Sequence, residues 1–252
     1  MQLVQAIDAY LPLQRLVEPR PAVVDAQFGE RFVGLAINSF TLAAVASVCA
    51  VALALLLAYA VRSSRSRLVA LARSAVGLGY AVPGAVIAVG ILIPVTRLDH
   101  LLSGLWQQWT GSNPGLVLTG GIAALVYAYL ARFLTVSLQS VESGLARITP
   151  SMDEAARSLG LGVGATLRRV HWPMLRGSLL TASLLVFVDV MKELPATLVM
   201  RPFNFDTLAT QAYTLASDER LQEASTAALA IVAVGLLPLI ALSRQIARSR
   251  RN

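Results

Sequence analysis

The sequence predicts an all-α transmembrane protein with five membrane-crossing helices. Of its 252 residues, 56% are hydrophobic and only 14% are charged, whereas soluble domains carry about 25% charged residues. The apolar residues are also gathered into separate runs long enough to cross a ~30 Å hydrocarbon core, which takes about 20 helical residues. Short arginine-rich stretches separate these runs. Together these observations favour a polytopic membrane protein over a soluble domain.

The apolar runs define a five-span domain over residues 38–246. Residues 1–37 are expected to form a non-cytoplasmic segment before it, and residues 247–252 a basic cytoplasmic tail. Proline removes a backbone N–H, so we expect Pro83 and Pro94 to kink the second span and Pro195 to kink the fourth. The expected spans are residues 38–61, 75–96, 116–138, 178–200 and 224–243.

The arginines predict the orientation of the chain. Thirteen lie in the loops after the first and third spans and in the C-terminal tail, against six in the alternate loops and the N-terminal segment. Because cytoplasmic loops carry the excess of basic residues, we expect the N-terminus outside and the C-terminus in the cytoplasm. Five spans place the two termini on opposite sides of the membrane, which agrees with this orientation. Arg132 is expected to extend from the cytoplasmic end of the third span to the membrane interface.

The loop between the third and fourth spans, residues 139–177, carries a helical pattern. Ser151 and Glu154 have the spacing of a capping box for a helix that begins near Met152. Gly160 stands where a left-handed glycine would end this helix, and a second short helix is expected over residues 165–172, ending at Pro173. A compact helix–turn–helix on the inner face is suited to docking against a cytosolic partner.

The fourth span contains three charges in an otherwise apolar stretch, FVDVMKELPATLVM. Lys192 is the only lysine of the chain, and it lies between Asp189 and Glu193. If the span is one helix, the three side chains share a face, and a lipid-facing position would cost several kcal/mol. The face either lines a translocation path or gate together with Pro195, or it forms an ion pair that only fixes helix packing.

Patterns for other chemistry are missing from the sequence. No Walker A glycine–lysine loop is present, so the chain is not expected to bind ATP. His100 and His171 lie far apart and Cys49 is the only cysteine, so neither a catalytic metal site nor a disulfide is expected. The net charge of +7 is confined to short loops, as in membrane topology signals and not in nucleic-acid binders. We therefore expect no enzyme activity, no cofactor and no nucleic-acid partner.

The cytoplasmic loop resembles a known motif. It contains Glu154-Ala155-Ala156, then Gly160 after three intervening residues, then Val170-His171-Trp172-Pro173 after nine more. This pattern resembles the EAA motif of permease subunits of type I, binding-protein-dependent ABC importers. That family ends the motif with Ile-x-Leu-Pro, so this chain differs by apolar-for-apolar changes. The resemblance implies a coupling helix that docks on a cytosolic ABC ATPase dimer, which would bind the ATP. It assigns the coupling role to Glu154, Ala155, Ala156, Gly160, Val170 and Pro173. Alternatively, Glu154 only caps its own helix and Gly160 only ends it.

Three further segments, residues 79–95, 191–213 and 215–221, resemble the ferric-iron branch of that family. The resemblance extends from about Asn38 to the C-terminus. Members of the branch usually carry two such units in tandem, and this chain resembles the second. The resemblance therefore implies the C-terminal half of a longer permease, a fragment, or a half-size subunit that pairs with a homologous or identical half.

The resemblance implies a permease of the bacterial inner membrane that imports ferric iron delivered by a periplasmic binding protein. Related branches move thiamine, phosphonate, sulfate or polyamines, and nothing in the composition separates them from iron. An ion-coupled secondary transporter that uses Asp189, Lys192 and Glu193 as a relay is the alternative from another class. It would leave the cytoplasmic helix–turn–helix without a role.

Overall fold

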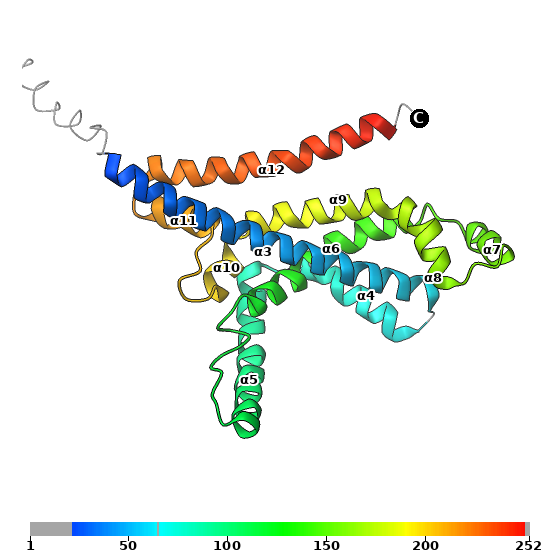
Figure 1. The fold of residues 1–252 in the computed structure, drawn as a ribbon, viewed down its shortest axis with the longest axis horizontal. Helices are drawn as coiled ribbons and strands as arrows, with labels where there is room; N and C mark the ends of the chain where they lie inside the picture. Colours follow the sequence, from blue (N-terminus) through cyan, green and yellow to red (C-terminus); the bar gives the residue numbers. More distant parts are fainter. Residues whose placement is uncertain (1–21, 65, 250–252) are drawn as a thin grey trace, which may run out of the picture.

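The computed structural model describes residues 22–64 and 66–249, and this part of the chain contains helices and no strands. The three longest interfaces join α3, α6 and α9, which lie side by side as the body of the molecule (Figure 1). The fold class predicted from the sequence is therefore confirmed as all-α. The helices are α3 (Ala22–Ser63), α4 (Arg67–Gly79), α5 (Gly84–Thr110), α6 (Ala123–Leu145), α7 (Pro150–Ser158), α8 (Val163–Thr166), the π-helical turn η1 (Leu167–His171), α9 (Trp172–Met191), α10 (Pro195–Met200), α11 (Leu208–Ser217) and α12 (Leu221–Ser249).

Four helical stretches in the described part of the chain are long and apolar enough to cross a membrane. They are Arg31–Ser63, Gly84–Thr110, Ala123–Leu145 and Gly164–Met191. A shorter apolar stretch, Leu221–Leu236, lies in α12, where the fifth span is expected. Residues 1–21 of the expected N-terminal segment and 250–252 of the expected tail lie outside the described residues.

Helix boundaries differ from the expected spans at two prolines. The second expected span, 75–96, is interrupted because α4 ends at Gly79 and α5 begins at Gly84, with Pro83 as its N-cap residue. The fourth, 178–200, is interrupted between Met191 and Pro195. Proline lacks an N–H but suits the first turn of a helix, so Pro195 begins α10 and does not kink a continuous helix. Pro94 does lie inside α5, as expected.

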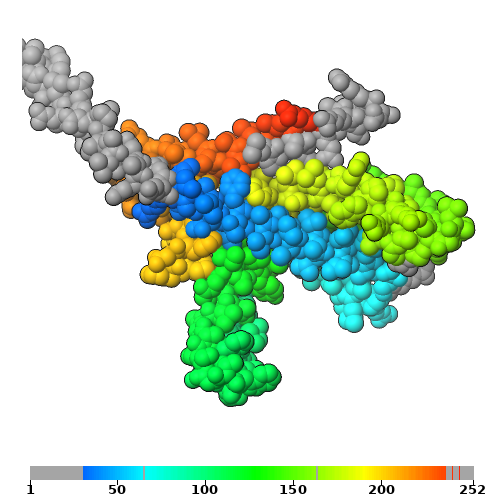
Figure 2. All heavy atoms as spheres, viewed as in Figure 1, coloured from blue at the N-terminus to red at the C-terminus, as the bar shows by residue number. Residues whose placement is uncertain are grey.

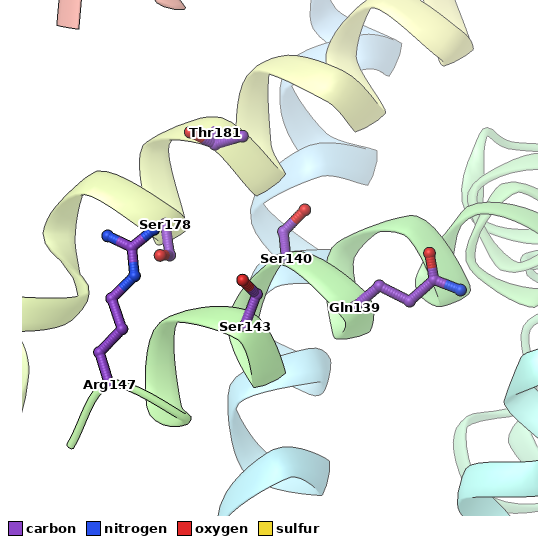
Figure 3. Close-up of a pocket in the computed structure, with 6 residues that line it drawn as sticks. All are labelled: Gln139, Ser140, Ser143, Arg147, Ser178 and Thr181. Carbon is purple, nitrogen blue, oxygen red and sulfur yellow. The ribbon is translucent and has the colours of Figure 1, made fainter. Parts of the chain in front are cut away.

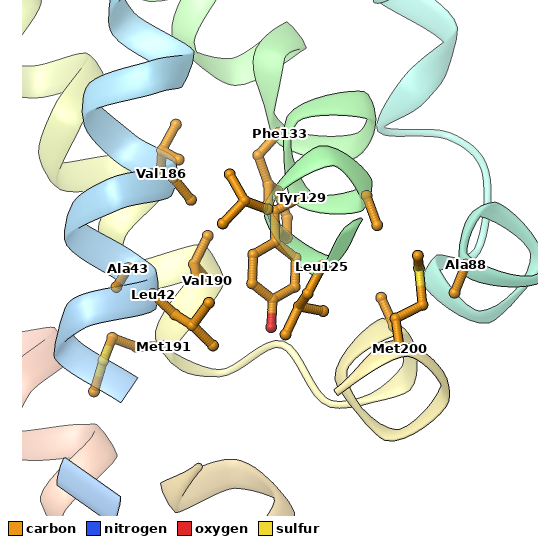
Figure 4. Close-up of a cluster of buried hydrophobic side chains, with 14 of the residues drawn as sticks. Leu42, Ala43, Ala88, Leu125, Tyr129, Phe133, Val186, Val190, Met191 and Met200 are labelled. Atoms are coloured by element: carbon orange, nitrogen blue, oxygen red, sulfur yellow. The ribbon is translucent and has the colours of Figure 1, made fainter. Parts of the chain in front are cut away.

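Small residues on α3 allow the body of the molecule to pack closely. Fully buried alanines recur every three or four positions along α3, facing α6 and α9. Larger side chains from the two facing helices, among them Tyr129, Phe133 and Val186, fill the space between them (Figure 4). Small residues at a helix interface let backbones approach, which is the usual basis of helix association in membranes. The alanines are Ala43, Ala46, Ala50, Ala54 and Ala58.

The distal part of α5 projects away from the body, as Figure 2 shows. The buried acid Asp99 on α5 holds the segment of chain that follows this helix and runs back along it. Its carboxylate accepts hydrogen bonds from the backbone N–H groups of residues 117–119 at 2.7–3.1 Å and from the Thr119 hydroxyl at 2.7 Å. A charge in an apolar helix is tolerated only when it is satisfied in this way.

A second clamp joins α3 to the start of α11. The Asn38 side chain donates to the backbone carbonyl of Asp206 at 3.0 Å, and the backbone N–H of Leu208 donates to the Ser39 hydroxyl at 2.8 Å. Leu208 is the first residue of α11, so one of its unpaired N–H groups is satisfied by α3. These bonds fix the start of α11 against α3.

Candidate functional site

Two groups of polar side chains lie at the two ends of α9. At its start, Tyr59, Arg62, Asp153 and His171 form a hydrogen-bonded set that we name the coupling cluster. At its end, Asp189, Lys192 and Glu193 form two ion pairs, one of them with Arg132 of α6, and we name these four residues the charged junction. The 20 residues of α9 separate the two groups by about 30 Å at 1.5 Å per residue.

The cytoplasmic helix expected from the sequence is α7, but it begins earlier than expected. Thr149 is its N-cap residue and Pro150 its first residue. The expected capping box is wrong, because the Ser151 hydroxyl bonds to that of Thr149 at 2.8 Å and Glu154 makes no side-chain hydrogen bond within the described chain. A proline in the first helical position, where its missing N–H costs nothing, explains the earlier start.

The end of α7 agrees with the sequence. Gly160 has a φ of +77°, a left-handed conformation that only glycine adopts without strain. Its N–H bonds to the carbonyl of Arg157 at 2.9 Å, and that of Leu161 to the carbonyl of Ala156 at 3.0 Å. This is a complete Schellman motif, so Gly160 turns the chain sharply away from the helix axis.

The residues with an expected coupling role do not all face outward. Glu154, Ala155, Gly160 and Pro173 are exposed, and Val170 is half-buried. Ala156 is only 4% exposed and faces its own chain, so the expectation that it faces a partner is wrong for this conformation. The surface that α7 presents is therefore built on Glu154 and Ala155 and ends at Gly160.

The expected second short helix is continuous with the following span. From Val163 the chain passes through α8 and η1 into α9 without a break. The N–H of Trp172 bonds to the carbonyl of Leu167, five residues earlier, so the backbone widens into a π-helical turn just before Pro173. Such turns relieve a disrupted hydrogen-bond ladder, and here one lets a proline follow without ending the helix.

The coupling cluster ties α7 to three other helices. Asp153 on α7 lies 2.7 Å from Arg62 Nη2, at the end of α3, and 2.7 Å from His171 Nε2, just before α9. Arg62 also donates to the carbonyls of Leu145 and Ile148 at 3.0–3.1 Å, which holds the end of α6. Because a carboxylate accepts hydrogen bonds, Nε2 of His171 donates and Nδ1 accepts from the Tyr59 hydroxyl.

The Asp153 carboxylate is held in its charged form. The hydrogen bond from Arg62 lowers the pKa of Asp153 below its usual value, burial opposes this shift, and the contact with His171 adds to the lowering. The sequence predicts no site role for any of the four residues: Arg62 contributes only to the prediction of topology, and His171 only occupies a variable position of the EAA-like motif. The close spacing of Asp153 to the EAA pattern was the available signal.

At the charged junction, Glu193 pairs with Arg132 and not with Lys192. Glu193 is 6% exposed, and its Oε1 lies 2.8 Å from Arg132 Nη1 and 3.3 Å from the backbone N of Ala196. The expectation that Arg132 reaches the membrane interface is therefore wrong: it points inward, 5.4 Å from the Phe133 ring centre. Gly84 makes room for the pair, since a Cβ there would collide with both Arg132 Nη1 and Glu193 Oε1.

The second pair of the junction is more exposed. Lys192 Nζ lies 2.9 Å from Asp189 Oδ1, one helical turn away, and the Lys192 side chain is 61% exposed. The three charges do not share one helix face because α9 ends at Met191, which turns Glu193 inward. In the described part of the chain no group of three or more His, Cys, Asp or Glu side chains could hold a metal ion.

Comparison with known proteins found no matching family model, but it found curated relatives. The chain is 26% identical over 207 residues to the Fe(3+)-transport system permease protein FbpB 2 of Haemophilus influenzae, covering 82% of this chain and 38% of that protein. It is 27% identical over 168 residues to the 2-aminoethylphosphonate transport system permease named PhnV of Salmonella typhimurium, covering 66% and 57%. The chain thus spans less than two thirds of the length of both relatives.

Solved structures of ABC transporters have the same fold. A chain of a bacterial alginate ABC transporter, in complex with an alginate-bound periplasmic protein, superimposes with a TM-score of 0.66 over 97% of this chain and 95% of that chain, at 16% identity. An amino acid ABC transporter gives 0.54 over 92% and 99%, at 22% identity.

The fold is therefore shared with chains of ABC transporters of known structure, and four of the described helices have the length and composition of a multi-pass membrane protein. In sequence the chain is similar to permease proteins named for the transport of ferric iron and of 2-aminoethylphosphonate.

Proposed function

We propose that this chain is the membrane permease of an ATP-driven importer in the bacterial inner membrane, and that its substrate is ferric iron delivered by a periplasmic binding protein. The N-terminus lies outside and the C-terminus in the cytoplasm, as the arginine distribution predicts. A cytosolic ATPase dimer binds and hydrolyses the ATP, so the chain itself needs no cofactor. A second permease half, homologous or identical, completes the path.

The observation that carries this proposal is that α7 exposes one face and is held to the body of the molecule by the other. Glu154 and Ala155 form an exposed surface with no side-chain partner among the described residues, while Asp153 and Ala156 on the opposite side of α7 hold it to the body. A small exposed alanine permits a close approach, and an exposed acid offers a charge to a basic groove. This is the geometry of a docking helix that is rigidly held from behind.

The coupling cluster gives α7 a mechanical connection to the spans. Movement of α7 is passed to α3 through Arg62 and to α9 through His171. Because α9 is continuous from Trp172 to Met191, it carries that movement to the charged junction. There the helix is interrupted before Pro195, and the interruption is where a rigid displacement can open or close a path.

The pairing at the junction favours this reading over an ion-coupled carrier. Each acid is neutralised by its own base, Glu193 by Arg132 and Asp189 by Lys192, which suits a fixed gate better than a proton relay. Ferric iron is favoured as the substrate by the curated relatives, several of which are named as ferric permeases.

The test is copurification of the tagged full-length chain from its native membrane in mild detergent, followed by mass spectrometry. A nucleotide-binding ATPase should accompany the chain, and Ala155→Trp should reduce its recovery at least tenfold because the indole blocks close approach. Vesicles made from the purified assembly should take up ferric iron only with ATP inside and binding protein outside.

Ala216→Trp is the matched control, because Ala216 is an exposed alanine on α11, far from α7. It should leave ATPase recovery unchanged. Recovery of the active chain without any ATPase would overturn the importer proposal, and uptake that follows a proton gradient would favour the ion-coupled carrier. Uptake of 2-aminoethylphosphonate in place of iron would correct the substrate alone.

A further inference from the structure

A polar pocket of about 320 Å³ opens between α6 and α9, on the side of the molecule that carries α7. Figure 3 shows Arg147 extending toward Ser178, with the side chains of Ser140 and Ser143 directed into the space between the two helices. The pocket belongs neither to the coupling cluster nor to the charged junction. Its lining residues are Gln139, Ser140, Ser143, Arg147, Ser178 and Thr181.

The lining offers hydrogen-bond donors that the described chain does not use. Arg147 makes no ion pair with any described residue, and the hydroxyls of Ser143 and Ser178 make no hydrogen bond with one. The hydroxyls of Ser140 and Thr181 each donate to a carbonyl of their own helix at 3.0 Å, so they are the less available pair. A guanidinium, two free hydroxyls and the Gln139 amide remain.

Close contact at the base of the pocket fixes its shape. A Cβ on Gly144 would lie 2.7 Å from the Ser178 Cβ, so α6 and α9 touch there and the space beside this contact is set by two packed helices. The polar side chains are costly if they face lipid tails. They are therefore expected to face water, a headgroup region or a bound solute.

The charge of the pocket favours an anionic ligand over a metal cation. None of the lining residues is acidic, and Arg147 is cationic. A bare metal cation would be repelled by Arg147 and would find no carboxylate, the donor that hard cations prefer. A tetrahedral oxyanion, in contrast, accepts charge-assisted hydrogen bonds from a guanidinium and ordinary ones from hydroxyls.

We propose that this pocket binds a phosphate-type oxyanion, with Arg147 as the charged hydrogen-bond donor and Ser143 and Ser178 as hydroxyl donors. Arg147 lies two residues beyond the end of α6, at the level where lipid phosphates meet water in the proposed orientation. The same chemistry is offered by a soluble phosphate or phosphonate group and by the phosphate of an anionic lipid.

The test uses the purified full-length chain in detergent, without ATP or any partner. Inorganic phosphate is titrated at constant ionic strength against chloride, and binding is followed by phosphorus-31 saturation-transfer NMR. In a second arm, the chain is extracted from vesicles of equal parts phosphatidylglycerol and phosphatidylcholine, and retained lipids are counted by native mass spectrometry.

Arg147→Gln should weaken oxyanion binding about tenfold or more, the loss expected for a charge-assisted hydrogen bond. Ser143→Asp should abolish it by placing a carboxylate in the pocket. Arg176→Gln is the matched control, because Arg176 is an exposed arginine near the start of α9 that does not line the pocket. It should change binding less than twofold, and circular dichroism should show the same helix content for all variants.

Phosphate binding that Arg147→Gln alone weakens supports the proposal with a soluble ligand. Selective retention of phosphatidylglycerol with the same dependence on Arg147 supports it with a lipid ligand. No preference for phosphate over chloride together with no selective lipid retention would overturn it, and so would an equal loss in Arg176→Gln. Because transport is not measured, either outcome is independent of the iron-import proposal.

Discussion

Single charged side chains decide how the ends of the helices are held. Arg62 is the clearest case, because one guanidinium satisfies Asp153 on α7 and two backbone carbonyls at and beyond the end of α6. Carbonyls in the last turn of a helix have no partner within it, so Arg62 caps one helix while pairing with another. Removal of the Arg62 guanidinium would release both α7 and the end of α6.

The pKa of Asp153 leads to a prediction about acid. Because its pKa is lower in the folded chain than its usual value near 3.8, its contribution to α7 docking is fully present above that value and is lost as pH falls through the lower folded pKa. The protection factors of the α7 amides, which compare their exchange with the intrinsic rate at the same pH, should therefore be high at neutral pH and lower near pH 3. Asp153→Asn should raise this exchange already at neutral pH, at a cost of about 1–3 kcal/mol.

Glu154→Gln serves as the comparison for Asp153→Asn, since Glu154 is the next residue, is exposed and has no side-chain partner among the described residues. It should leave exchange unchanged at both pH values. Equal effects of the two variants would mean that Asp153 does not hold α7.

Gly84 leads to a prediction about the buried ion pair. Gly84→Ala should push Arg132 and Glu193 apart, because the added methyl group would occupy the space that both side chains use. We expect a loss of about 1–3 kcal/mol, the usual cost of overpacking, measured as a lower thermal midpoint of the purified chain.

The control for Gly84→Ala lies on the same helix. Gly90 is exposed, and a Cβ there would meet nothing within 4 Å, so Gly90→Ala should be neutral or slightly stabilising through helix propensity. If both variants melt at the temperature of the parent chain, the pair does not depend on the space at Gly84.

At the scale of elements, the sequence predicts helix type well and helix breaks poorly. The apolar runs correctly predicted helices, and Gly160 correctly predicted the end of α7, because those signals are local. The run from 75 to 96 reads as one span because hydropathy records apolar length, while the break before Gly84 depends on Pro83 and on the contact of Gly79 with the backbone of Ala131 on α6. That contact joins residues too distant for a local pattern.

The candidate site also has a part that a local pattern predicts and a part that depends on contacts between distant residues. The EAA pattern predicts a coupling role for Glu154, Ala155 and Gly160, which are exposed, whereas the residues that hold α7 could not be predicted from the sequence. Arg62 and Asp153 are 91 positions apart, and Arg132 and Glu193 are 61 apart. Which of several arginines meets which acid is decided by the packing of whole helices, and no local pattern encodes it.

At the scale of the whole molecule, the proposed orientation can be tested with single cysteines. In a Cys49→Ser background, Phe203→Cys should react with a membrane-impermeant maleimide on intact spheroplasts, because Phe203 is 95% exposed and lies between α10 and α11 in a loop expected outside. Leu159→Cys, exposed at the end of α7, should react only after the membrane is opened.

Wild-type chain and the Cys49→Ser parent provide the background for this labelling. The opposite pattern, with Leu159→Cys labelled on intact cells, would reverse the orientation and remove α7 from the cytosol. Labelling of both positions from outside would contradict the proposed spans between them.

The hydrogen bonds of Asp99 can form only after a delay that is set by the order of synthesis. The N–H groups that satisfy this carboxylate belong to residues made 18–20 positions later, so at 5–20 residues per second the acid waits roughly 1–4 s for its partners. The clamp between Asn38 and Asp206 spans 168 positions, a delay of roughly 10–30 s. The first long helix is thus complete well before the segment that locks it exists. During that interval the polar side chains of Asn38 and Ser39 need other hydrogen-bond partners. The contacts of this bundle therefore form one after another as the chain is made, and not in a single step.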